Sequence, residues 1–144
     1  MLFIRLYIKG YFTIDTYIKN YTNTFDIKGK EITVTAPARF EKNTDRLIND
    51  NELDDQAIEI VQERYRQKYG FVGPADIKKL RKKWKLSQRQ LASVLGWSSS
   101  TIALYEIGEI PTVGNNRLLN VLIKNPQVMK DFIEEKKNSD NLEL

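Results

Sequence analysis

The stretch LSQRQLASVLGWSSSTIALYEIG, residues 86–108, decides the fold of the second half of this chain. Ser87 and Gln90 have the spacing of a capping box, so a helix is predicted to begin there. Gly96 follows the apolar positions of that helix and suits the left-handed backbone that ends it. Ser98 can then cap a second helix. The sequence therefore predicts two short helices joined by a tight turn.

The second of these helices is predicted to carry a small, largely polar outer face. Ile102 and Tyr105 face inward by their spacing of three. The residues left outward are Ser99, Ser100, Ala103 and Leu104. Such a face fits the major groove of DNA, so the pattern is typical of a helix-turn-helix and predicts DNA binding. A helical hairpin that only packs a core is the alternative.

Nine side chains are candidates for contact with DNA: Gln88, Arg89, Ser98, Ser99, Ser100, Thr101, Ala103, Leu104 and Arg117. We expect the hydroxyl groups of residues 99–101 at base edges, and Ala103 and Leu104 at thymine methyl groups. Gln88 and Ser98 are expected at phosphates, where amide groups at helix starts assist. Two alternatives stay open: Gln88 as a surface residue that extends the cap, and Leu104 as a second core contact.

Positive charge is concentrated in the half that holds the motif. The first 73 residues carry eleven basic and eleven acidic side chains, whereas residues 74–137 carry twelve basic and six acidic ones. Phosphate binding requires a positive field of this kind. The candidates for the flanking DNA backbone are Arg89 and Arg117, with Lys78 and Lys82, which alternatively form a solvated stripe.

Composition argues against several other functions. The 144 residues include no cysteine and no histidine, which excludes disulfides and removes the usual ligands of a structural zinc site. No catalytic constellation is recognisable, so we expect no enzyme activity, no cofactor and no metal. No apolar run reaches membrane-spanning length, and the opening residues lack a signal peptide's basic segment. A cytoplasmic protein without membrane contact is the expectation.

The first half is predicted to be rich in strands. Residues 2–8 and 11–18 are dense in aromatic and β-branched residues. A hairpin is expected around Gly29 and Lys30, ended by Pro37. A helix is predicted over residues 52–69. The apolar residues at helical spacing within it are Leu53, Ala57, Ile60, Val61 and Tyr65.

The second half is predicted to be helical throughout, which gives an α+β fold. We expect a β-rich domain with a linker helix over residues 1–70, and a five-helix DNA-binding domain over residues 74–137. Gly70 and Gly73 are expected to form a hinge between the two halves. Two protomers are joined either by the long middle helix or by the apolar side of the fifth helix, unless both only close the core of the monomer. That apolar side is formed by Val128, Met129, Phe132 and Ile133.

The sequence resembles known families at two levels. The second half resembles the Xre/Cro-type helix-turn-helix family, whose pattern continues in the Glu106 and Gly108 of YEIG. The whole chain is similar to MqsA/YgiT-type antitoxins of bacterial toxin–antitoxin pairs, over residues 25–61, 65–108 and 117–126. That resemblance implies an amino-terminal zinc domain that grips a toxin, and a helix-turn-helix that binds the operon's own promoter as a dimer.

The chain departs from those antitoxins at two places. They hold zinc with paired CxxC motifs, and around the second pair this chain has residues 41–44, Glu-Lys-Asn-Thr. They read bases with an Asn and an Arg, where Ser100 and Leu104 stand here. The first departure implies a domain packed without metal. The second implies an operator read without bidentate contacts.

Three functions remain open on the sequence. An antitoxin would neutralise a partner toxin and repress its own operon. A stand-alone transcriptional regulator of a phage or mobile element would use the first half to dimerise. An interaction module would carry only a vestigial helix-turn-helix. Either DNA-binding protein is expected to be a homodimer on a palindrome. The aromatic side chains available for a protein interface or a core are Tyr7, Tyr11, Phe12, Tyr17 and Tyr21.

Overall fold

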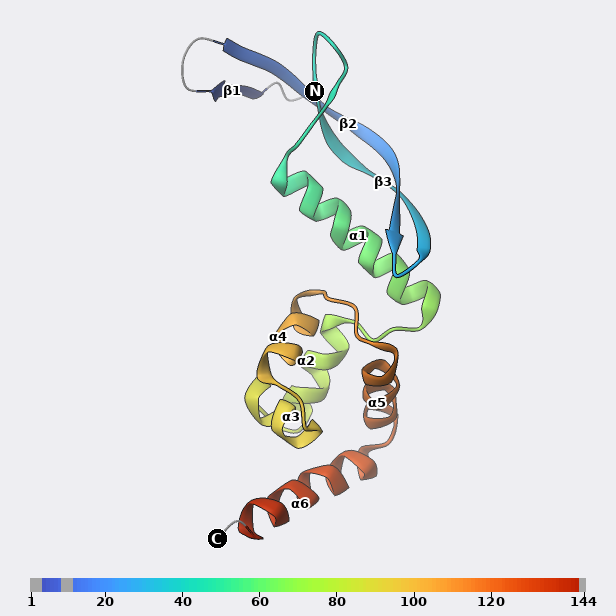
Figure 1. The fold of residues 1–144 in the computed structure, drawn as a ribbon, viewed down its shortest axis with the longest axis vertical. Coiled ribbons are helices and arrows are strands. Elements are labelled where there is room, and N and C mark those ends of the chain that lie inside the picture. Colours follow the sequence, from blue (N-terminus) through green and yellow to red (C-terminus); the bar gives the residue numbers. More distant parts are fainter. Residues whose placement is uncertain (1–3, 9–11, 143–144) are drawn as a thin grey trace. The chain divides into compact units, whose positions relative to one another are not determined.

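A computed structural model describes residues 4–8 and 12–142 (Figure 1). The chain divides into two compact units, Met1–Tyr65 (the first unit, or unit 1) and Arg66–Leu144 (the second unit, or unit 2). Four strands and six helices occur among the described residues, which confirms the predicted α+β class. The strands are β1 (Ile4–Ile8), β2 (Phe12–Ile27), β3 (Lys30–Glu41) and β4 (Leu47–Ile48). The helices are α1 (Asn51–Tyr69), α2 (Pro74–Lys83), α3 (Gln88–Leu95), α4 (Ser99–Ile107), α5 (Val113–Lys124) and α6 (Pro126–Leu142). Predictions made for Leu2, Gly10, Tyr11 and the side chains of Tyr7 and Phe12 lie outside the described residues.

The first unit contains an antiparallel sheet in the order β1-β2-β3-β4. β2 and β3 form a long hairpin that turns at Lys28 and Gly29, with Ile27 opposite Lys30. Lys28 and Gly29 have φ angles of 51° and 76°. Two successive positive φ angles make the turn that matches the right-handed twist of paired strands. The predicted hairpin is therefore confirmed.

The strands run further than predicted. β2 is continuous to Ile27, and β3 passes through Pro37, which was expected to end it. Pairs alternate between hydrogen-bonded and open along an antiparallel hairpin. Counted from the turn, Pro37 opposite Asn20 is an open pair, so its nitrogen faces away from β2. β4 pairs with β3 only at Arg39 and Phe40, so among the described residues no strand needs a donor from Pro37.

One face of β3 and one face of α1 form the core of the first unit. The buried apolar residues of β3 are Ile32, Val34, Ala36, Ala38 and Phe40. On α1, Val61 and Tyr65 are buried at a spacing of four. Ile60, which was expected inside, is 39% exposed because it lies one residue, or about 100°, off that row.

A buried ion pair joins β3 to the start of α1. The Arg39 side chain donates from Nε to Asp50 Oδ2 over 2.6 Å and from Nη1 to Thr16 Oγ1 over 3.1 Å. Asp50 also caps the helix, because its Oδ1 accepts from the backbone N–H of Leu53. Removing the carboxylate partner of a guanidinium buried in this way is strongly destabilising.

The loop between β3 and β4 is held by hydrogen bonds. The backbone N–H of Glu41 donates to Arg46 O, and that of Asp45 donates to Glu41 O, both over 2.8 Å. Thr44 Oγ1 donates to Glu41 Oε2. Lys19 Nζ lies 2.7 Å from Asp45 Oδ1. No group of three or more potential metal ligands occurs among the described residues.

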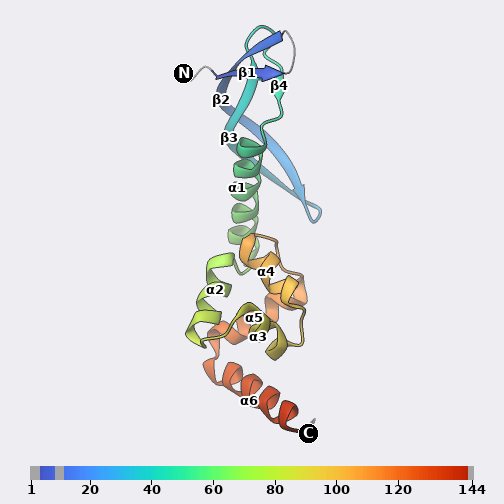
Figure 2. The same cartoon turned by 90° about the vertical axis from the view of Figure 1, so that its left-hand side faces the viewer.

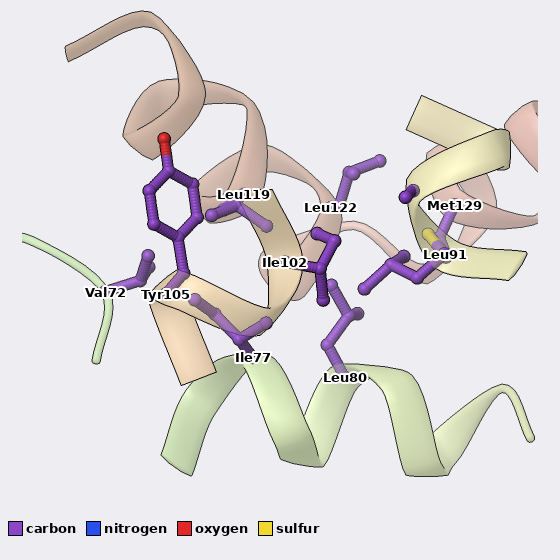
Figure 3. Close-up of a cluster of buried hydrophobic side chains, with 10 residues drawn as sticks. Val72, Ile77, Leu80, Leu91, Ile102, Tyr105, Leu119, Leu122 and Met129 are labelled. Carbon is purple, nitrogen blue, oxygen red and sulfur yellow. The ribbon is translucent and has the colours of Figure 1, made fainter. Parts of the chain in front are cut away.

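The second unit is a helical bundle of α2–α6. α2 packs against α4 and α5, α3 packs against α4 and α6, and α5 packs against α6 (Figure 2). The side chains of one cluster converge from all five helices and from Val72 (Figure 3). The buried members are Val72, Ile77, Leu80, Leu91, Ala92, Ile102, Tyr105, Leu119, Leu122 and Met129. From α6, Val128, Phe132 and Ile133 pack against this cluster, so this side of α6 closes the core.

Gly96 lets the chain turn between α3 and α4. It ends α3 with φ 70°, and a Cβ added there would have no heavy atom within 4 Å. Gly96→Ala is therefore expected to lower the free energy of unfolding by about 1 kcal/mol, through backbone strain alone. Urea denaturation measures the change. Gly114→Ala is the control, because Gly114 also has open space but no positive φ, so this change should not destabilise the protein.

Candidate nucleic-acid interface

The ends of α3 and α4 are fixed by side chains beside them. Ser87 Oγ accepts from Gln90 N–H over 3.1 Å, and Ser87 N–H donates to Gln90 Oε1 over 2.8 Å. The predicted capping box is therefore confirmed. Ser98 caps α4, and its Oγ accepts from the N–H of Thr101. These local bonds hold the two helices and the turn in place.

The outer face of α4 is exposed as predicted. Ile102 and Tyr105 are almost completely buried. Leu104 is 43% exposed, so it is not a core residue of this unit. Ser99 and Ser100 are exposed, and Ala103 is half-buried. The face therefore offers hydroxyl and methyl groups and no charged side chain.

Ile107 adds to this face, and its exposure was not predicted. It is the last residue of α4 and is 79% exposed. Its spacing of three from Leu104 places both on one side of the helix. The sequence feature that could have indicated this exposure is the position of Ile107 directly before Gly108, which ends the helix, so that no following helical turn covers its side chain.

The hydroxyl groups at the start of α4 form a small cluster. Ser98 Oγ lies 2.9 Å from Ser100 Oγ and 2.9 Å from Thr101 Oγ1. A hydroxyl has one donor and two acceptor sites and rotates to suit its partners. The structure thus brings Ser98, Ser100 and Thr101 together, and each can exchange an internal bond for one to a phosphate or a base.

A buried polar network lies behind this face. Arg81 of α2 donates from Nε to Glu106 Oε1 over 2.7 Å and from Nη2 to Glu106 Oε2 over 3.0 Å. Gln88 of α3 donates from Nε2 to Glu106 Oε2 over 2.8 Å. Glu106 of α4 is only 3% exposed. The network therefore fixes three helices relative to one another, and it holds Gln88, a predicted phosphate contact, beside α4.

The pKa of the Glu106 carboxyl is lowered within this network. Burial alone would raise that pKa, but hydrogen bonds from Arg81 and Gln88 outweigh burial and bring it below the ordinary 4.5. In the first unit, the hydrogen bond from Arg39 likewise lowers the pKa of Asp50 below 3.8. Both carboxylates therefore stabilise the folded state in their ionised form.

Acid is expected to destabilise the protein through these two groups. Because their folded pKa values lie below the unfolded ones, the stability they contribute is present above about pH 4.5 and is lost as the pH falls through the folded pKa values. The melting temperature should thus drop by several degrees between pH 6 and pH 3.5. Calorimetry across that range tests this, and Glu106→Gln with Asp50→Asn should flatten the dependence. An equally steep fall in the double variant would contradict the assignment.

The predicted basic contacts lie on three helices. Arg89 is exposed on α3, Arg117 is exposed on α5, and Lys78 and Lys82 are exposed on α2. Of these, Lys78 lies close enough to Glu106 to lower its pKa by its charge. Arg89 shares α3 with Gln88, whereas α5 packs on α2 and α6. The structure thus brings Lys78 near α4 and does not join Arg117 to that face by any described contact.

Comparison with known families agrees with this geometry. The helix-turn-helix family model HTH_3 matches residues 77–115. This segment is a helix-turn-helix. The match begins at Ile77 within α2, includes α3 and α4 and ends in the first turn of α5, so the Arg81–Glu106 network lies inside it. It supports the Xre/Cro-type family for this part of the chain and a role in sequence-specific DNA binding and transcription regulation.

Two further findings concern relatives of the protein and its helices. No curated protein matches the sequence. Among the described residues, the helices are too short or too polar to cross a membrane. The family comparison therefore characterises the helix-turn-helix segment.

Proposed function

We propose that this chain is an autoregulating antitoxin, in which unit 2 binds operator DNA as a homodimer and unit 1 binds and neutralises a toxin. One observation carries the DNA-binding part: the exposed face of α4 lies inside the helix-turn-helix match. Charge supports it, since residues 66–142 hold fourteen basic and seven acidic side chains. The antitoxin part is supported by the resemblance of residues 25–126 to MqsA/YgiT-type antitoxins.

At the operator, α4 lies in the major groove. Ser99, Ser100 and Thr101 contact base edges through their hydroxyls, and Ala103 and Leu104 pack on thymine methyl groups. The contacts expected at phosphates are Gln88, Arg89, Ser98 and Arg117. Because a single α4 covers few base pairs, two protomers bind half-sites about 34–36 Å apart.

The test of DNA binding is a salt titration on the DNA upstream of the chain's own gene. Fluorescence anisotropy measures affinity for this duplex and for a scrambled duplex of equal length. Each neutralised phosphate contributes about −0.9 to the slope of log K against log salt. Ser100→Ala is expected to reduce the preference for the upstream duplex without changing the slope, since a hydroxyl at a base edge carries no charge. A slope near zero would overturn the proposal.

The antitoxin part is tested by the neighbouring gene. We expect a small adjacent open reading frame whose expression alone stops growth, and whose effect is relieved when this chain is co-expressed. Co-purification of the two products, followed by repetition with unit 2 variants that no longer bind DNA, separates neutralisation from repression. A harmless neighbour, or a toxic one that this chain does not relieve, contradicts the antitoxin part and leaves a stand-alone regulator.

A further inference from the structure

Unit 1 has an apolar groove between the β2–β3 hairpin and α1. Its free volume is about 150 Å³. An apolar cavity of that size holds a benzene-sized group, so a leucine or phenylalanine side chain fits. The lining includes Tyr21, Phe25 and Leu47 from the sheet, and Leu53, Asp54 and Ile58 from α1.

The apolar lining continues onto the surface. Leu47 is 46% exposed, and Tyr21 and Ile58 are each 38% exposed. These three side chains come from β4, β2 and α1, so the exposed patch surrounds the groove on several sides. A contiguous exposed apolar patch with a hollow in it marks an interaction surface more often than isolated exposed residues do.

The charge of unit 1 indicates the chemistry of the partner. Residues 12–50 carry six acidic and six basic side chains, whereas residues 51–60, the first part of α1, carry four acidic side chains and no basic one. The excess negative charge therefore lies on α1, which forms one wall of the groove and contributes Asp54 to its lining. This surface repels DNA phosphates and attracts cations.

We propose that this groove binds a basic segment of a partner protein: one large apolar side chain enters the hollow, and flanking Lys or Arg side chains lie along the acidic α1. The inference rests on the partner-binding part of the proposed function and gives that partner its chemistry. It is independent of DNA binding, because every residue that it uses belongs to unit 1. Charge sets the rate and specificity of such an encounter, and the apolar side chain holds the complex together.

The experiment uses random 12-residue peptides displayed on phage and selected against the full chain. The enriched peptides are expected to share a large apolar residue flanked by Lys or Arg. A synthetic peptide of the consensus sequence is then titrated by fluorescence anisotropy. Leu47→Gln with Ile58→Gln should weaken binding at least tenfold. Asp55 and Glu59 are exposed carboxylates beside the groove-lining residues of α1, so Asp55→Asn with Glu59→Gln should weaken binding several-fold and reduce its salt dependence.

The matched control is Ile60→Gln. Ile60 is 39% exposed on the same helix but does not line the groove, so this change should leave peptide affinity unaltered. All variants change exposed side chains, and thermal melts check that each one folds. Operator affinity, measured in parallel, should be equal in all of them. If the wild-type chain does not bind the upstream duplex, DNA binding is refuted, but the inference about the groove is unaffected.

Several outcomes would overturn the inference. They are a selection without enrichment, enriched peptides without basic residues, and a consensus peptide that binds the Leu47→Gln/Ile58→Gln variant as tightly as the wild type. Sedimentation equilibrium provides the last test. If Ile58→Gln turns a dimer into a monomer while Ile60→Gln does not, a second copy of the chain covers the groove and the assignment to a basic partner is wrong.

Discussion

Leu104→Glu is expected to reduce operator affinity at least a hundredfold while leaving the protein folded. The substitution places a carboxylate on the exposed face of α4, where it would lie among DNA phosphates and could not pack on a thymine methyl group. The fold should tolerate it because the Leu104 side chain is 43% exposed. Fluorescence anisotropy with the upstream duplex measures the loss, and circular dichroism verifies the helix content.

Val121→Glu is the matched control for this prediction. Val121 is 45% exposed on α5, so the variant has the same change in charge and hydropathy away from α4. Its lower net charge should weaken DNA binding only a few-fold, through the long-range field. If the Leu104→Glu and Val121→Glu variants bind the upstream duplex equally well, α4 does not enter the groove.

Arg81→Met is expected to cost about 3–5 kcal/mol in the free energy of unfolding, the largest stability effect of a single substitution here. The change removes the two hydrogen bonds from Arg81 to Glu106 and the one to Leu86 O, and it leaves the Glu106 carboxylate, 3% exposed, with the hydrogen bond from Gln88. An uncompensated buried charge is far more costly than the loss of an exposed pair. Urea denaturation monitored by the fluorescence of Trp84 and Trp97 measures the change.

The double variant Arg81→Met/Glu106→Leu distinguishes charge burial from loss of packing. It replaces the whole ion pair with apolar side chains, which is often neutral or even stabilising. We expect it to regain much of the stability lost in Arg81→Met. If the two variants are equally unstable, packing of the Arg81 stem, and not the stranded charge, sets the cost.

The helix-turn-helix could be predicted because its signals are local. Ser87 with Gln90, Gly96 and Ser98 act on backbone groups within three or four residues, so the sequence order alone indicates where α3 and α4 begin and end. The inward positions on α4 follow from helical periodicity in the same way. Exposure at the end of α4 is not periodic, which is why the Ile107 side chain was missed.

The polar networks could not be predicted because their partners are distant in sequence. Arg81 and Glu106 are 25 positions apart, and Arg39 reaches both Thr16 and Asp50. The extent of β3 depends likewise on which strands flank Pro37. A sequence pattern gives the face of an element but not the side chain that will meet it, so such pairs become visible only once the topology is known.

The hydrogen-bonded loop between β3 and β4 affects how the protein depends on its surroundings. The loop is held by its own backbone hydrogen bonds and by the ion pair of Lys19 and Asp45, so it can form as the chain folds without a bound metal ion. Metal-built domains lose their shape when chelators strip them. Because the sequence contains no cysteine, oxidants that attack thiols have no target in this domain.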